Sequence, residues 1–364
     1  MINNNPQDPL AELITTYNEL NSSVIEALHE EPSPLEFMRF VARNTPFVIR
    51  GGASNWKATQ TWSPAYLSEH LGDEPVNVAV TPLGYVLSNA DSPTLYEDGT
   101  LVFAKPWEES QPFTEFLNYI IQQEKDPSSL QGEVHYAQTQ NDNLRDEYAS
   151  LFNHVQPDIS FARIALQQKS PDAINLWIGN SQSTTALHKD NYENIYVQIL
   201  GKKHFVLLPP HCRPCVNEKL LRPASYKRVV NDDDDPSPLL LSETTGHVLS
   251  KLKLELDKIE EASESGHGEN SGLVPFATWD PEDDGPSGDY ATPYSKLAQP
   301  VKVTLEPGDM LYLPAMWYHK VSQSCNPEEG ICVAVNYWYD MEFAGPLYPF
   351  SAFVRSVYES QQHK

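Results

Sequence analysis

The chain has 364 residues with 50 acidic and 25 basic side chains, and its formal net charge at pH 7 is −25. This length can bury a large core, and the charge disfavours nucleic acid and anionic membranes, so we expect neither as a partner. The amino-terminal residues show no basic segment followed by an apolar core, and no run approaches a membrane span. We therefore expect a cytoplasmic protein, with the nucleus as a second location.

Residues 1–45 predict a helical region. Apolar residues recur at roughly helical spacing through the first thirty residues, which predicts one or two amphipathic helices there. "SPLEFMRFVARN" predicts the next helix, with Ser33 as its N-cap and Pro34 in its first turn. "SPAYLSEHLGD" and "PFTEFLNYIIQQE" predict two more helices further along the chain.

Short runs rich in β-branched and aromatic residues predict a β domain over residues 46–345. These runs are separated by turn residues and include "PFVIR", "VNVAV", "VHYAQTQ", "INLWIG", "NIYVQIL", "HFVLL", "VKVTL", "MLYLP" and "ICVAVNYWY". No helical pattern separates "NIYVQIL" from "HFVLL", which favours an antiparallel barrel or sandwich over a doubly wound sheet. Residues 346–364 predict a C-terminal amphipathic helix.

Residues 224–299 differ in composition from the rest of the chain. They contain 16 acidic and 6 basic residues, a net charge of −10. "NDDDDPSP", "EASESGHGENSG" and "DPEDDGPSGDY" predict solvated loops. "KLKLELD" fits both a strand and a helix face, and we favour the strand. We interpret this segment as an acidic insertion in the β domain, since it lacks the features of a second domain.

His188 and Asp190 are candidate metal ligands because residues at i and i+2 of a β-strand project from the same face. His319, which follows a turn and a β-rich run, is the candidate third ligand. Two histidines and one carboxylate with open positions form the facial triad of non-haem Fe(II) oxygenases. A histidine beside an aspartate is common on protein surfaces, and zinc accepts the same donors, so the pair needs further support.

Lys203 provides that support, because it lies within an apolar strand where a bare ammonium group would be costly. A lysine in that position requires an anion. Thr185, Tyr136 and Asn194 could donate hydrogen bonds to the same anion. A dicarboxylate that binds Fe(II) at one end and Lys203 at the other satisfies these features.

The chain resembles the Jumonji-C (JmjC) family of iron- and 2-oxoglutarate-dependent oxygenases. The resemblance covers roughly Pro34 to Arg355, and its most specific segments are "LHKDNYENIYVQILGKKHFVLLPP" and "LEPGDMLYLPAMWYHKVSQS…ICVAVNYWYDMEF". It implies a mainly β fold with added helices, a double-stranded β-helix of the cupin type. It also implies Fe(II) as the metal, with 2-oxoglutarate and O2 as cosubstrates.

The resemblance also implies a role for each matching residue. His188, Asp190 and His319 correspond to the iron ligands. Lys203, Thr185 and Tyr136 correspond to the residues that bind the distal carboxylate of 2-oxoglutarate. Four more residues correspond to amides near the proximal carboxylate and to aromatic walls of the cavity: Asn194, Asn336, Tyr196 and Trp338.

Within the family, the chain is similar to the small lysyl hydroxylases. This similarity implies hydroxylation of a lysine residue in a protein substrate, with developmentally regulated GTP-binding proteins as the substrates. The same iron chemistry would also serve a histone lysine demethylase, but the chain has no evident reader or zinc module. A third alternative is a non-catalytic cupin that binds a metal or a partner, although such a scaffold has no need of Lys203.

Two weaker features remain. Cys212 and Cys215 form a CxxC motif, but no second CxxC accompanies it, so zinc or redox chemistry is disfavoured. The C-terminal helix packs either on its own barrel or on a second copy of the chain. Relatives that dimerise through C-terminal helices lead us to consider a homodimer.

Overall fold

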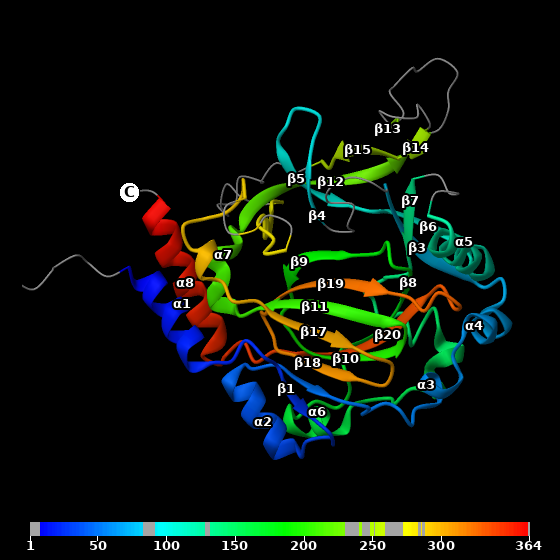
Figure 1. The fold of residues 1–364 in the computed structure, drawn as a ribbon, viewed down its shortest axis with the longest axis horizontal. Helices are drawn as coiled ribbons and strands as arrows, with labels where there is room; N and C mark the ends of the chain where they lie inside the picture. Colours follow the sequence, from blue (N-terminus) through cyan, green and yellow to red (C-terminus); the bar gives the residue numbers. More distant parts are fainter. Residues whose placement is uncertain are drawn as a thin grey trace, which may run out of the picture.

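The structure is a computed structural model that describes residues 8–82, 92–127, 132–229, 240–241, 248–250, 252–258, 272–282, 285 and 288–362. Two facing sheets form its centre, with strand orders β1-β2-β18-β10-β20-β8 and β17-β11-β19-β9 (Figure 1). Their strands are β1 (Glu26–Leu28), β2 (Phe47–Ile49), β8 (Ala173–Gly179), β9 (Thr185–Lys189), β10 (Tyr192–Leu200), β11 (Lys202–Leu208), β17 (Val301–Leu305), β18 (Met310–Leu313), β19 (Tyr318–Ser324) and β20 (Cys332–Asp340). The predicted cupin-like, mainly β fold with added helices is confirmed.

Consecutive strands cross between the two sheets at a tight turn. β10 ends at Leu200 and β11 begins at Lys202, so a single residue, Gly201, connects the sheets. Gly201 has a φ of 68°, and a Cβ atom there would lie 3.0 Å from the backbone oxygen of Ser324. Glycine is required at this turn because its backbone is left-handed and closely approached. The turn places the end of β10 and the start of β11 on opposite walls of one barrel.

Apolar side chains from both sheets fill the space between them. They come from alternate positions of the strands, as expected for strands with one face turned inward. The cluster includes Tyr136, Trp177, Tyr196, Phe205, Leu207, Val303, Leu305, Leu311, Leu313, Trp317, Val321 and Ala334. This core holds rigid the strands that carry the candidate site.

Smaller sheets and helices pack around the barrel. The sheets have orders β6-β3-β7 and β15-β12-β5-β4, and β16 also pairs with β12. Their strands are β3 (Pro75–Pro82), β4 (Ser92–Leu95), β5 (Leu101–Lys105), β6 (Trp107–Pro112), β7 (Glu133–Tyr136), β12 (Lys219–Arg228), β15 (Leu252–Leu256) and β16 (Val274–Phe276). A further pair joins β13 (Leu240–Leu241) to β14 (Val248–Ser250). The helices are α3 (Lys57–Thr61), α4 (Pro64–Leu71), α5 (Phe113–Lys125) and α6 (Ser160–Ala165), with η1 (Ala149–His154).

The N-terminal region is only partly helical. α1 (Pro9–Leu20) begins at the N-cap Asp8, and α2 (Pro34–Arg43) begins at Ser33, which forms a capping box with Glu36. Between them, Glu26–Leu28 form β1, which pairs in parallel with β2. The prediction of helix through the first thirty residues was therefore wrong after Leu20, because pairing with the barrel sheet overrides the local helical spacing.

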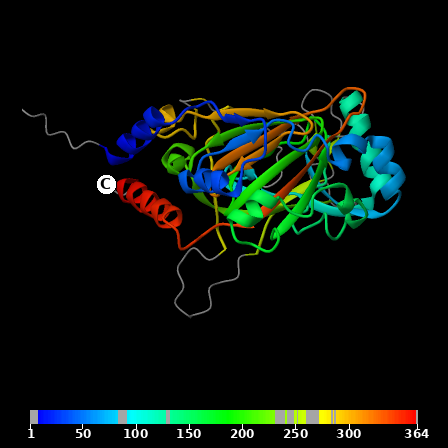
Figure 2. The same cartoon turned by 90° about the horizontal axis from the view of Figure 1, so that it is seen from below.

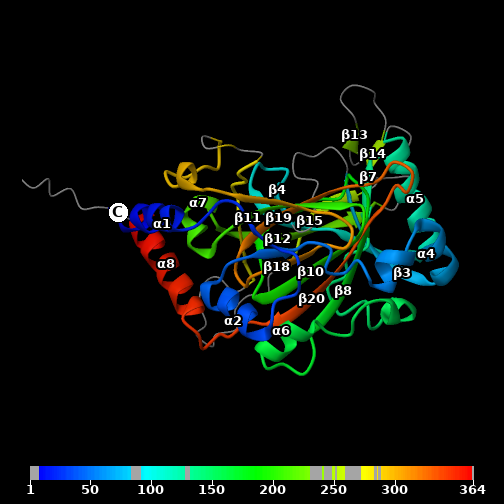
Figure 3. The ribbon, with the colours of Figure 1, turned by 60° about the horizontal axis from the view of Figure 1, so that its bottom comes forward.

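The C-terminal segment forms α8 (Leu347–Gln362), which lies beside α1 at the opposite end of the barrel from α4 and α5 (Figures 1 and 3). Figure 2 shows the same two terminal helices from below, with the barrel strands beyond them. Val354 and Tyr358 of α8 pack against an apolar cluster that includes Ile14, Cys212 and Cys215. η2 (Pro210–Cys212), α7 (Arg213–Val216) and η4 (Ser295–Leu297) complete this end. Among the described helices, none is long and apolar enough to cross a membrane.

Part of the predicted acidic insertion packs on the barrel. Its first residue, Ala224, lies inside β12, and "KLKLELD" contains β15, which confirms the strand prediction there. "DPEDDGPSGDY" was predicted to be a solvated loop, but Asp280 lies 2.9 Å from the buried ammonium group of Lys320. This prediction was wrong for Asp280, because its partner lies in the folded barrel and could not be inferred from local composition. "NDDDDPSP" lies wholly, and "EASESGHGENSG" almost wholly, outside the described residues.

Candidate metal centre

His188, Asp190 and His319 converge on one point. Their ligand atoms all lie within 4.8 Å of one another, and they are the one group of this kind among the described residues. Oδ2 of Asp190 lies 3.8 Å from Nε2 of His188 and 3.6 Å from Nε2 of His319. The ring centroids of the two histidines are 4.1 Å apart.

Strand pairing brings these residues together. β9 and β19 are antiparallel neighbours, and His188 and His319 are directly opposite each other in their register. Asp190 is two residues after His188 and lies just beyond the end of β9. Its backbone oxygen accepts a hydrogen bond from the backbone nitrogen of Met316. The local sequence had suggested β9, but β19 and its register with β9 require the folded barrel.

Each histidine turns its Nε2 toward Asp190. Nδ1 of His188 lies 2.8 Å from the backbone oxygen of Ala186, and Nδ1 of His319 lies 3.0 Å from that of Trp317. A carbonyl oxygen only accepts, so Nδ1 is the donor in both contacts and Nε2 is the ring nitrogen left to face a ligand. Backbone hydrogen bonds of this kind orient metal-binding histidines.

The electrostatics of the centre favour a cation. Burial, and then the neighbouring His188, lower the pKa of His319 to about 4, so its ring is neutral at pH 7. The Nε2 atoms of both histidines and a carboxylate oxygen of Asp190 thus face one another. A divalent metal ion satisfies such a set, and this donor chemistry fits Fe(II) bound by two histidines and a carboxylate.

Lys203 is buried without a carboxylate partner. Its side chain lies on β11 with 2% of its surface exposed, and Nζ donates to Tyr136 Oη at 2.9 Å and Gln323 Oε1 at 2.8 Å. Among the described residues, none forms an ion pair with it. Burial disfavours the charged amine, but the oxygens of Tyr136 and Tyr196 more than offset this, and the pKa of Lys203 is raised. A buried ammonium group with only neutral partners suits the carboxylate of a ligand.

The remaining predicted residues line one pocket with the metal centre. Tyr136 from β7, Thr185 from β9, and Asn194 and Tyr196 from β10 contribute, together with Asn336 and Trp338 from β20. Thr185 is half-buried opposite Val321 in the β9–β19 register. The sheet β8-β20-β10 thus forms one wall of the pocket, and the strands of the metal ligands form the other.

A hydrogen-bonded chain orders the amide side of the pocket. Nε1 of Trp177 donates to Oδ1 of Asn336 at 2.9 Å, and Nδ2 of Asn336 donates to Oδ1 of Asn194 at 3.2 Å. This chain determines which way both amides point, because Trp177 can only donate. Trp338 stacks on Tyr192, with centroids 4.7 Å apart and an angle of 2° between the rings.

Sequence reasoning missed the pocket-lining residues Gln140, Trp177 and Val321, and it also missed Gln323, which contacts Lys203. Gln323 is the register partner of Lys203 on β19. The alternation of His319, Val321 and Gln323 would have placed Gln323 on the inward face once β19 was recognised as a strand. Gln140 lies outside the named strands and left no comparable signal in the sequence.

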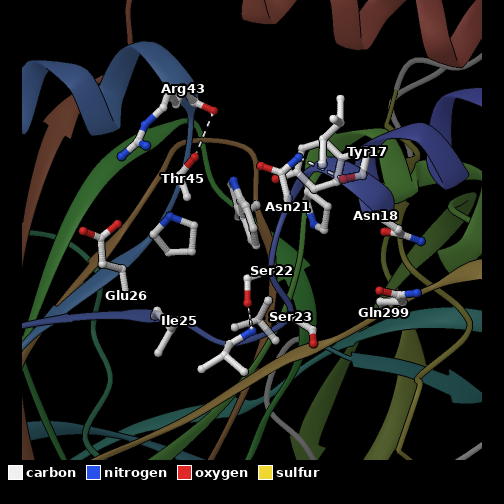
Figure 4. Close-up of a pocket in the computed structure, with 16 residues that line it drawn as sticks. Tyr17, Asn18, Asn21, Ser22, Ser23, Ile25, Glu26, Arg43, Thr45 and Gln299 are labelled. Carbon is white, nitrogen blue, oxygen red and sulfur yellow. Dashed lines mark hydrogen bonds between the residues drawn. The ribbon is translucent and has the colours of Figure 1, made fainter.

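A second pocket is larger but lacks ligands for a metal. Its volume is about 260 Å³ against about 30 Å³ at the metal pocket, and residues 17–26 form much of its lining. Figure 4 shows Glu26, Arg43 and Thr45 on one side and Tyr17, Asn18 and Gln299 on the other. Its lining contains one carboxylate and no histidine or cysteine. The candidate functional site is therefore identified by its set of metal-ligand donors and not by the volume of its pocket.

Comparison with known families agrees with this fold. Residues 32–345 match the family described as "Cupin-like domain". Relatives at least 30% identical over most of the chain carry JmjC names. The chain therefore belongs to the JmjC family of cupin-fold 2-oxoglutarate oxygenases.

Three relatives illustrate the range of names within the family. A Homo sapiens protein named "Bifunctional peptidase and (3S)-lysyl hydroxylase JMJD7" is 36% identical over 87% of this chain and 84% of its own length. An Arabidopsis thaliana protein named "Lysine-specific demethylase JMJ32" is 36% identical over 88% of this chain and 82% of its own. "JmjC domain-containing protein E" of Dictyostelium discoideum is 31% identical over 92% of this chain and 88% of its own length.

Proposed function

We propose that this protein is an Fe(II)- and 2-oxoglutarate-dependent dioxygenase that hydroxylates a lysine residue of a protein substrate. The observation that carries the proposal is the pairing of the acceptor triad of His188, Asp190 and His319 with the uncompensated cation of Lys203. Similarity to the relative named as a lysyl hydroxylase supports the lysine substrate. A developmentally regulated GTP-binding protein is our proposed target, on the strength of the family resemblance.

Different residues at this site would bind the metal and the cosubstrate. His188, Asp190 and His319 would hold Fe(II), while Lys203 and Tyr136, with Thr185, would bind the distal carboxylate of 2-oxoglutarate. Asn194 and Asn336 would orient its other end. Together with O2, the bound metal and cosubstrate supply the oxidation of a C–H bond to C–OH, as 2-oxoglutarate becomes succinate and carbon dioxide.

Demethylation of methyl-lysine is the second candidate, because an equally similar relative is named a lysine-specific demethylase. Both reactions use the same metal and cosubstrate, so the site's donor set does not separate them. The two differ in the product: hydroxylation adds one oxygen atom to the peptide, whereas demethylation removes a methyl group.

Mass spectrometry of peptides tests the proposal directly. Lysine and methyl-lysine peptides, including peptides from GTP-binding proteins, are incubated with the protein, Fe(II), 2-oxoglutarate and O2. Gain of one oxygen atom on unmodified lysine supports hydroxylation. Loss of methyl groups without oxygen addition would show that the reaction is demethylation instead. Asp190→Ala is the control, because it should abolish succinate formation and metal binding while circular dichroism of the fold is retained. Normal turnover by Asp190→Ala would remove the proposed metal centre.

A further inference from the structure

The stacked rings of Trp338 and Tyr192 connect the metal pocket to the surface. Trp338 lines the pocket and is 7% exposed, whereas Tyr192 is half-buried at the start of β10. Their rings are nearly parallel, at 4.7 Å. A substrate side chain that enters the pocket along this wall therefore meets an aromatic surface for its apolar portion.

Two exposed carboxylates lie at the outer end of this wall. Asp172 accepts a hydrogen bond from Tyr192 Oη at 3.2 Å, and its backbone nitrogen donates to the backbone oxygen of Trp338. Asp340 is the register partner of Tyr192 on β20. Both carboxylates thus lie at one end of the sheet β8-β20-β10, next to the wall of the pocket.

Asp172 and Asp340 have no cationic partner among the described residues. In the described part of the chain, no lysine, arginine or histidine forms an ion pair with Asp172 or Asp340. Arg145, which lies close to Asp172, directs Nε to Asp142 at 2.7 Å and Nη2 to the backbone oxygens of Pro171 and Asp172. The pair of carboxylates is therefore available to a cation from outside.

A second feature of this wall is an unpaired hydrogen-bond donor. Nε1 of Trp338 is buried and has no hydrogen-bond acceptor in the described structure. A buried indole N–H normally has a partner. Lack of an acceptor at the wall of the pocket is expected where a bound molecule supplies one, as a peptide carbonyl or carboxylate would.

We propose that Asp172 and Asp340, together with the hydroxyl group of Tyr192, receive the ammonium group of the substrate lysine. This inference rests on the proposed function, which makes lysine the substrate, and it names the residues that select it. Carboxylate and hydroxyl oxygens match the three N–H donors of an ammonium group. A trimethylated lysine has no such donor and is favoured by cages of several aromatic faces, of which this wall offers few. The subsite therefore favours unmodified lysine.

A binding experiment tests the subsite without turnover. The probes are two fluorescently labelled peptide libraries with random flanks, one with a central lysine and one with norleucine, which has a similar length but no ammonium group. The iron-free protein should bind the lysine library about tenfold more tightly, as expected for a charge-assisted hydrogen bond. The double variant Asp172→Asn, Asp340→Asn should bind both libraries equally.

Glu12→Gln with Glu19→Gln is the matched control, because it removes two exposed charges from α1, away from the pocket. This control should keep the preference for lysine. The subsite would be overturned if the parent protein showed no preference for the lysine library, or if the Asp172 and Asp340 double variant kept that preference.

Kinetics of the loaded enzyme separate the subsite from the proposed reaction. In the double variant, KM for a lysine peptide should rise about tenfold or more, while KM for 2-oxoglutarate and the iron content stay unchanged. If oxygen is never added to lysine but the libraries still differ, the proposed reaction fails and the subsite stands. If hydroxylation occurs and the double variant matches the parent, the subsite fails and the reaction stands.

Discussion

Lys203 is a cation that the barrel buries between two neutral partners, Tyr136 and Gln323. Lys203→Met should remove the charge while retaining much of the apolar stem. Loss of a charge-assisted hydrogen bond costs roughly 1.5–3 kcal/mol, about one to two orders of magnitude in affinity. We expect the KM for 2-oxoglutarate to rise by this factor, with metal content unchanged.

The control for this prediction is Lys202→Met on the same strand. Lys202 forms a surface ion pair with Glu306, and both side chains are about half exposed. Surface pairs of this kind contribute little, so 2-oxoglutarate dependence should not change. A Lys203→Met enzyme with a parental KM for 2-oxoglutarate would show that Lys203 does not bind the cosubstrate.

At the scale of single residues, the sequence predicted the ligands better than their supports. His188 and Asp190 could be selected by their i, i+2 spacing, and Lys203 because its charge lies within an apolar run. Gly179 could not be selected, because its role depends on three distant side chains. A Cβ atom there would lie 2.7 Å from atoms of Tyr136, Gln323 and Ser183. Only the folded barrel reveals that glycine leaves room for the partners of Lys203.

At the scale of elements, the two strands that carry the metal ligands are connected on their outer side. Lys189 lies between His188 and Asp190, Tyr318 precedes His319, and the two are register partners. Both donate to the carboxylate of Glu218, Tyr318 at 2.7 Å, and Arg213 donates to it as well. Because successive strand residues alternate faces, Glu218 connects β9 and β19 from the face opposite the metal pocket.

Glu218→Gln should therefore weaken metal binding without removing a ligand. Gln keeps the size but loses the charge that Lys189 and Arg213 require, which allows the two strands to shift. We expect about a tenfold loss of Co(II) affinity, in the range found for residues that support metal ligands. Titration followed by visible absorption measures this loss. Glu306→Gln, which affects only a surface pair, should bind Co(II) like the parent, and an identical affinity for Glu218→Gln would refute the connection.

The packing of α1 on η2 should make stability depend on pH. The ring of His211 lies 3.9 Å from that of Tyr17, and its Nε2 is buried without a partner in the described structure. Burial lowers the pKa of His211 from 6.5 to about 4. Below pH 6.5 the unfolded chain therefore binds a proton that the folded protein excludes. The stability that the neutral, buried ring of His211 contributes is therefore fully present above pH 6.5 and is lost as the pH falls toward 4.

Urea unfolding at about pH 7 and about pH 5 tests this dependence. One excluded proton costs about 1.4 kcal/mol per pH unit, so the parent should lose about 2 kcal/mol from this group over that interval. His211→Gln cannot be protonated and should lose about 2 kcal/mol less than the parent between the two pH values. The measured quantity is the change in the free energy of unfolding between the two pH values, so a different stability of the variant at pH 7 does not affect the test. Parallel losses in parent and variant would contradict the assignment to His211.

At the scale of the whole molecule, local patterns predicted most strands and helices but not their long-range pairings. The helices at Pro34, Pro64 and Phe113 have caps or apolar stripes in their own sequence. β1 lacks such a signal, because its pairing with β2 stabilises it. Asp280 likewise acquires its role from Lys320, forty residues away. The homodimer remains a prediction, although α8 leaves Tyr348, Phe350 and Phe353 exposed.

The net charge of −25 provides a long-range attraction for a basic substrate. The tract Asp232 to Asp235 concentrates four of these charges in the predicted insertion, and it lies outside the described residues. A solvated tract of this kind can serve solubility alone. If it steers the substrate, its effect should appear in the association rate and be screened by salt over about 10 Å at 0.1 M ionic strength.

Replacing Asp232 to Asp235 with Asn should therefore lower kcat/KM for a lysine-rich protein substrate at low ionic strength and leave it unchanged at high salt. The value of kcat at saturating substrate should stay constant, because steering acts before the chemical step. The matched control removes the same charge from exposed positions on α1, α4 and α5, with Gln at Glu12, Glu19, Glu69 and Glu115. An equal effect of both variants would assign steering to total charge, and no effect of the Asn variant at any ionic strength would leave the tract with a role in solubility alone.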